Sequence, residues 1–218
     1  RDIIDRDVRD RAADRCRSLG VTLPTFAQLA EPDLIPADVQ GRLATVDPGA
    51  ADPLNLFRAH WFNDATGAGR VDVPEHLVLP PELTGVASPI VIALGNRFPM
   101  IGSHKVIAAY GCLAPRIVTG QFDPATQRAI WPSTGNYCRG GVAISRIMGC
   151  RGVAVLPTGM SRERFEWLER QPAEDDVRGP NLDALVDLAG GVDGGRGGAR
   201  PVRVQHVSLG RARLIDLQ

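Results

Sequence analysis

The sequence predicts an α/β fold in which helices flank a parallel sheet. Apolar runs with the length of buried strands alternate with segments that have a helical pattern. The strand candidates are residues 89–94 (PIVIAL), 127–131 (QRAIW) and 152–157 (GVAVLP). The helix candidates are residues 103–113, 137–149 and 161–170. This alternation at short spacing is typical of parallel strands that are covered by helices.

The chain before this pattern predicts a helical and loop-rich N-terminal region, residues 1–84. Within residues 1–20, Ile4, Val8, Ala12 and Cys16 fall on one stripe of a helix, and Gly20 is a stop signal. Residues 21–84 are rich in Pro, Asp and Leu and contain several turns. We therefore place an α/β cofactor-binding core at residues 85–170, where Ser103 and Ser161 are the expected helix caps.

The last part of the chain, residues 171–218, differs from the core. It contains eight glycines, six of them within residues 190–198 (GGVDGGRGG), and the apolar periodicity fades. Such a tract is typical of a flexible linker. We expect an atypical Gly/Arg-rich tail that is disordered or read out of frame, so that the chain is the front portion of a longer protein.

Composition narrows the classes of partner. The chain has 25 basic and 25 acidic residues, so neither nucleic acid nor an anionic membrane is expected as the main partner.

The four cysteines form no C-x-x-C pair, which predicts no zinc site, and Cys138 is expected to be a buried structural residue. The longest apolar run, Ile90 to Leu94, is too short to span a bilayer. No signal peptide is visible, which predicts a cytoplasmic protein.

Lys105 is the only lysine beside 24 arginines. A GC-rich genome replaces lysine by arginine wherever only a charge is needed, but a guanidinium cannot supply an amine that loses its proton. Lys105 follows a Gly-Ser turn at the predicted start of a helix, where the helix dipole and a desolvated cleft both favour the neutral amine. Such an amine forms a Schiff base with a carbonyl compound. A surface lysine without chemistry is the alternative.

The second candidate site is the loop Ser133-Thr134-Gly135-Asn136, between a predicted strand and a predicted helix. Backbone N–H groups and hydroxyls at a helix N-terminus bind carboxylate or phosphate. Asn136 adds an uncharged amide that can address a ring oxygen. The alternative is an ordinary polar helix cap.

Together these two segments resemble the fold type II pyridoxal-phosphate-dependent enzymes, the family of cysteine synthase and the tryptophan synthase β-subunit. Gly102-Ser103-His104-Lys105 is similar to the family's lysine segment, and residues 133–136 are similar to its S/T-S/T-G-N loop, 28 residues after Lys105. The resemblance covers residues 85–170 and is looser upstream. It implies that Lys105 holds pyridoxal 5′-phosphate, that Asn136 faces the cofactor ring, and that Ser133, Thr134, Gly135 and Asn136 bind the substrate carboxylate.

The implied function is β-elimination or β-replacement on a small amino acid, as in cysteine synthase or a cysteine desulfhydrase, in a homodimer. The pattern departs from the family at Arg97 and Phe98, which separate Asn96 from Pro99, and at Tyr137, which replaces a small hydroxyl residue. The glycine-rich loop that binds the phosphate in this family has no good counterpart. Two alternatives stay open: a truncated, catalytically silent homologue that acts as a partner or relic, and a domain that binds another anionic metabolite at residues 133–136.

Overall fold

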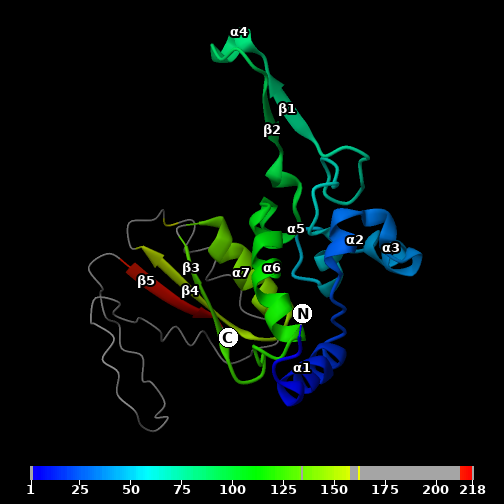
Figure 1. The fold of residues 1–218 in the computed structure, drawn as a ribbon, viewed down its shortest axis with the longest axis vertical. Helices are drawn as coiled ribbons and strands as arrows, with labels where there is room; N and C mark the ends of the chain where they lie inside the picture. Colours follow the sequence, from blue (N-terminus) through cyan, green and yellow to red (C-terminus); the bar gives the residue numbers. More distant parts are fainter. Residues whose placement is uncertain (1, 134, 158–161, 163–211, 218) are drawn as a thin grey trace.

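A computed structural model describes residues 2–133, 135–157, 162 and 212–217 (Figure 1). The helices are α1 (Arg6–Ser18), α2 (Phe26–Ala30), α3 (Ala37–Leu43), α4 (Pro81–Thr84), α5 (Pro99–Gly102), α6 (Lys105–Val118) and α7 (Asn136–Ile147), with short 3₁₀ segments η1 (Pro32–Leu34), η2 (Pro53–Arg58) and η3 (Gly95–Arg97). The strands are β1 (His76–Leu79), β2 (Ile90–Ala93), β3 (Arg128–Pro132), β4 (Arg151–Pro157) and β5 (Ala212–Leu217). The predicted helix 161–170 lies outside the described residues, apart from Arg162, and so does the tail before Ala212.

A three-stranded sheet in the order β3-β4-β5 forms one side of the body. β3 and β4 are parallel, with Ile130 opposite Val153, and α7 makes the crossover between them. This strand–helix–strand unit was predicted from the sequence, with boundaries that shift by one or two residues. β5 pairs antiparallel to β4, with Leu217 opposite Gly152. It was not predicted, because residues 171–218 were expected to be an atypical tail that is disordered or read out of frame.

The interpretation of residues 89–94 as a buried strand of the parallel sheet is wrong. Residues 90–93 do form a strand, β2, but it pairs antiparallel with β1 in a separate two-stranded sheet. All four residues of β2 are exposed. Figure 1 shows the β1–α4–β2 hairpin as an arm that projects away from the body. An apolar run of this length indicates a strand, but it does not identify the neighbours that would bury it.

Helix α7 packs closely onto the sheet because it carries glycine and serine where Trp131 lies. A Cβ on Gly141 would come within 2.1 Å of the Trp131 ring, so only glycine fits there. The Trp131 Nε1–H donates a 2.9 Å hydrogen bond to Ser145 Oγ, which satisfies the polar atom of a buried indole. Cys138, in the same helix, is fully buried, as predicted.

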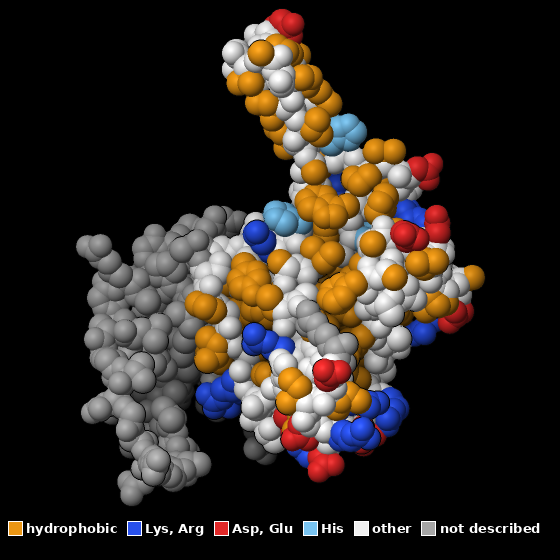
Figure 2. Space-filling view, viewed as in Figure 1, with side chains coloured by type: hydrophobic (Ala, Val, Ile, Leu, Met, Phe, Trp, Pro, Cys, Tyr) orange, Lys and Arg blue, Asp and Glu red, His pale blue; other side chains and the backbone are white. Residues whose placement is uncertain are grey.

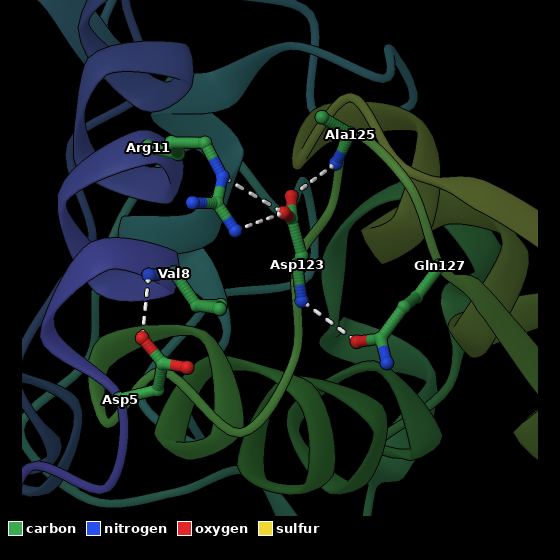
Figure 3. Close-up of polar contacts among 6 residues, drawn as sticks. All are labelled: Asp5, Val8, Arg11, Asp123, Ala125 and Gln127. Atoms are coloured by element: carbon green, nitrogen blue, oxygen red, sulfur yellow. Dashed lines mark hydrogen bonds and ion pairs between the residues drawn. The ribbon is translucent and has the colours of Figure 1, made fainter.

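Asp5 is the N-cap of helix α1, and its carboxylate accepts a 3.0 Å hydrogen bond from the Val8 N–H (Figure 3). Arg11 donates two hydrogen bonds to Asp123 Oδ2, from Nε at 3.1 Å and from Nη2 at 3.0 Å. Asp123 also accepts from the Ala125 N–H at 2.9 Å, and its own N–H donates to Gln127 Oε1 at 2.8 Å. This network fixes α1 to the loop that precedes β3.

The two regions divided at residue 84 share one hydrophobic core. Ala12, Leu56 and Ala59 of the first region belong to the same buried cluster as Val106 and Ile144 of the second. The hairpin also crosses the division, since β1 lies before residue 84 and β2 after it. In the described part of the chain, no helix combines the length and apolar character needed to cross a bilayer.

Candidate functional site

Lys105 is the first residue of α6, two residues beyond the predicted cap Ser103. The N-cap position belongs to His104, whose side chain makes no capping hydrogen bond. Ser103 is buried and its Oγ accepts the Lys105 N–H at 3.4 Å, so the serine does support the helix start, although α6 begins later than predicted. The Lys105 side chain is half-buried, and it forms no ion pair with any residue that the structure describes.

The turn before Lys105 holds an unusual backbone. Met100 has φ 66° and ψ −56°, and among the described residues it is the only one other than glycine with a positive φ. Gly102 follows with φ 57°. The Met100 N–H donates to the Pro48 carbonyl at 2.8 Å, which holds the turn in place. A residue in this region costs on the order of 1–3 kcal/mol, and such strain clusters at ligand sites.

The second segment lies at the start of α7. Asn136 is the first helical residue and is exposed, and its Oδ1 accepts a 3.4 Å hydrogen bond from Arg139 Nη1. Ser133 is half-buried and its Oγ accepts the Gly135 N–H at 3.2 Å. Thr134 lies outside the described residues. Ser133 and Gly135 therefore lie between the end of β3 and the start of α7, and Asn136 begins the helix.

The starts of the two helices are brought together through Gly140. A Cβ on Gly140 would lie 2.8 Å from the Lys105 carbonyl oxygen and 3.2 Å from the Val106 nitrogen. Asn136 precedes Gly140 by about one helical turn, or about 6 Å along the axis. The first turn of α6 therefore lies against α7 close to the loop that was predicted to bind a carboxylate.

Neither helix start carries an acidic side chain that would neutralise its positive end. Neither N-cap residue, His104 or Gly135, makes a side-chain capping hydrogen bond, and neither first turn contains an acidic residue. The first N–H groups of a helix need acceptors and carry partial positive charge. Two such ends that lie close together, with a lysine at one of them, favour an anionic ligand.

His104 forms the aromatic wall beside Lys105. Its ring stacks on Trp61 with centroids 5.5 Å apart and meets Phe98 edge-on at 6.4 Å. A Cβ on Gly95 would come within 2.7 Å of His104 Nδ1, so glycine is needed at this contact. Burial, and then the neighbouring Lys105 cation, lower the pKa of His104, which favours the neutral imidazole. Sequence reasoning missed Trp61 and Phe98, because no local pattern links them to the helix start.

Two cavities lie elsewhere on the body. One, of about 510 Å³, lies at the C-terminal end of α7 and the first residues of β3 and β4, opposite to the predicted site. The other, of about 140 Å³, is lined by the Met100–Gly102 turn, Pro48 and Gly67. The smaller cavity is therefore lined in part by the turn that precedes Lys105 in the chain.

Comparison of the chain with protein-family models, curated proteins and solved structures finds no match. Within the described residues, no group of three or more His, Cys, Asp or Glu side chains could hold a metal ion. The candidate site therefore rests on its own geometry: Lys105, the His104 ring beside it and two helix N-termini without acidic residues.

Proposed function

We propose that the chain is a fold type II pyridoxal-phosphate-dependent enzyme, or the front portion of one, that performs β-elimination or β-replacement on a small amino acid. A half-buried Lys105, beside an aromatic wall and two helix N-termini without acidic residues, carries the proposal. The proposal places the protein in the cytoplasm as a homodimer, with neither nucleic acid nor a membrane as its partner.

The residues at the site fit the two ends of the cofactor. Lys105 supplies the amine for its aldehyde, and the ring of His104, whose lowered pKa favours the neutral form, offers a flat surface beside it. The partial positive charge of the two helix starts suits its phosphate or the substrate carboxylate. The glycine tract 190–198 lies outside the described residues, so the phosphate is assigned to no loop.

When bound, pyridoxal phosphate supplies an aldehyde that captures amines and a ring that withdraws electrons from the substrate Cα. Lys105 holds this group and, once displaced by the substrate amine, accepts the Cα proton on its Nζ. Ser133, Thr134, Gly135 and Asn136 hold the substrate carboxylate and fix the orientation of Cα. The Tyr137 hydroxyl donates to Cys112 Sγ of α6 at 3.2 Å.

The single lysine makes the test unusually clean. The protein is mixed with pyridoxal phosphate, reduced with borohydride and digested with a protease. Mass spectrometry then measures the masses of the peptides. We expect the pyridoxyl mass on the peptide that contains Lys105. Lys105→Arg keeps the charge but cannot form the bond, so it should lose both the label and the visible absorption of the mixture.

Labelling of the α-amino terminus alone, or equal absorption in Lys105→Arg, would contradict the proposal. A chain without label at Lys105 whose thermal stability still rises with simple carboxylates would point to the anionic-metabolite alternative. A chain that responds to neither would be the catalytically silent homologue.

A further inference from the structure

Basic and acidic residues are unevenly distributed along the chain, although their total numbers are equal. Between Glu82 and Glu163 the sequence contains eight lysine or arginine residues and one acidic residue, Asp123. Figure 2 shows acidic side chains at the tip of the β1–α4–β2 arm and over the N-terminal helices. The part of the body that is built from α6, β3, α7 and β4 therefore carries an excess of positive charge.

The larger cavity, of about 510 Å³, collects four arginines from four different elements. Arg15 belongs to the last turn of α1 and Arg146 to the last turn of α7. The starts of β3 and β4 supply Arg128 and Arg151. None of the described residues that line the cavity is acidic. Helix C-termini attract cations, which accounts for the two helical arginines but not for the two at the strand starts.

The two arginines at the strand starts occupy neighbouring positions in the sheet. Arg128 lies directly opposite Arg151 in the parallel register of β3 and β4, so their side chains leave the sheet on the same face. Like charges opposite each other on adjacent strands are destabilising. Both residues, like Arg146, also interact with other groups of the folded chain, and a bound anion would add to these contacts.

Arg15 is held in place by the turn that follows α7. Its side chain is half-buried, and its Nε donates a 2.7 Å hydrogen bond to the Gly149 carbonyl. Gly149 has φ 61°, and a Cβ there would lie 3.1 Å from Arg15 Nε, so the turn fits closely around the guanidinium. The carbonyl is neutral, and Arg15 forms no ion pair with any residue that the structure describes. The terminal nitrogens of Arg15 can therefore serve an anionic ligand.

We propose that this cavity binds a small polyphosphate anion. Guanidinium groups match phosphate oxygens through paired hydrogen bonds, and several phosphates in one ligand balance several of the four charges. Asp123 adjoins the lining in sequence but already accepts two hydrogen bonds from Arg11 (Figure 3). The volume falls within the usual range of small-molecule sites, about 300–1,000 Å³. Among the described lining residues no side chain is aromatic, so the phosphates rather than a base are recognised.

The cavity is separate from the site at Lys105. It lies at the starts of β3 and β4, whereas Ser133 and Gly135 follow the end of β3. Binding of polyphosphate there does not require the lysine amine. Lys105→Arg should therefore bind polyphosphate as the wild type does, whatever the outcome of the labelling with pyridoxal phosphate.

Isothermal titration calorimetry of the full chain with inorganic triphosphate tests the proposal. We expect saturable binding with a Kd below about 1 mM, which weakens as salt screens the charges. Arg15→Gln keeps a donor for the Gly149 carbonyl but removes the charge, and it should weaken binding at least about tenfold. Arg17→Gln is the matched control, because Arg17 lies in the same helix but is exposed and pairs with Asp14. It should change the affinity by less than about threefold.

A second variant guards against a loss of folding in Arg15→Gln. Arg128 is exposed, so Arg128→Gln should keep the circular dichroism spectrum of the wild type and still weaken triphosphate binding at least about fivefold. ATP in place of triphosphate distinguishes a nucleotide from inorganic polyphosphate. We expect equal affinities, and ATP that binds more than about tenfold tighter would assign the cavity to a nucleoside triphosphate.

Three results would each overturn the proposal. The first is the absence of saturable triphosphate binding up to about 10 mM. The second is equal affinity in Arg15→Gln, Arg128→Gln and Arg17→Gln, which would show that only net charge matters. The third is loss of triphosphate binding in Lys105→Arg, which would place the anion at the other site.

Discussion

The missing side chain of Gly140 sets how closely α7 approaches the carbonyl of Lys105. A Cβ at residue 140 would lie 2.8 Å from that oxygen, and backbone atoms cannot move aside as a flexible side chain does. Gly140 therefore fixes the spacing between the start of α6 and the loop that leads into α7. The relationship joins the two segments on which the proposed function depends.

Gly140→Ala should destabilise the protein by about 1–3 kcal/mol, because the added methyl must push the two helices apart. Urea unfolding followed by circular dichroism measures the change. Gly111→Ala is the control: Gly111 lies within α6 with no atom near its missing Cβ. That variant should gain about 0.5–1 kcal/mol from helix propensity. Equal effects at the two glycines would show that the close approach is not rigid.

Protonation of His60 should lower the stability of the protein in mild acid. Burial, with further effects from the Arg70 and Arg58 cations, lowers the pKa of His60 to about 4. An unfolded histidine binds its proton near pH 6.5, so the unfolded state holds more protons between about pH 6.5 and 4. The free energy of unfolding should therefore fall as the pH falls through this window, by at most about 3 kcal/mol.

His60→Gln removes the titrating group and should flatten this part of the pH profile. The Phe62 N–H donates to His60 Nδ1 at 3.1 Å, and glutamine can offer an acceptor in its place. Denaturation curves at several pH values, for wild type and variant, provide the comparison. An unchanged slope in the variant would assign the pH dependence to other groups.

Loss of the Arg11 guanidinium should weaken the attachment of α1. Arg11→Gln removes both hydrogen bonds to Asp123, which is buried, and should cost about 1–2 kcal/mol. The exposed pair of Arg17 and Asp14 serves as the control, and Arg17→Gln should stay within about 0.5 kcal/mol. Chemical denaturation of both variants gives the difference, and a cost for Arg17→Gln as large as that for Arg11→Gln would argue against a special role for the buried contact.

Ser145→Ala should cost about 1–3 kcal/mol although it removes only one oxygen. The Trp131 Nε1–H would remain buried without its acceptor, and an unsatisfied buried donor retains its full desolvation cost. Ser18→Ala offers a comparison, because Ser18 is exposed and its hydroxyl bonds only to a carbonyl of its own helix. A near-neutral result for Ser145→Ala would mean that water replaces the lost hydroxyl.

Local pattern alone identified most of the elements around the site. The apolar spacing of residues 127–157 predicted β3, α7 and β4, because a strand, a crossover helix and a parallel strand carry their periodicities within a short stretch of chain. The first helix was predicted in the same way, and Cys138 was expected to be buried because the cysteine spacing fits no zinc site. Lys105 and residues 133–136 stood out through residue type and spacing, which require no contact information.

Tertiary structure decided what these elements contact. The run PIVIAL reads as a buried strand, yet β2 pairs with β1 on an exposed arm, because the same apolar residues suit any neighbour that can cover them. Trp61, Phe98 and His104 meet only because separate segments fold onto one another, and the strained Met100 is held by the Pro48 carbonyl from a distant loop. The amino-acid order determines local periodicity and chemical type, whereas contacts between distant segments depend on how the whole chain fills its core.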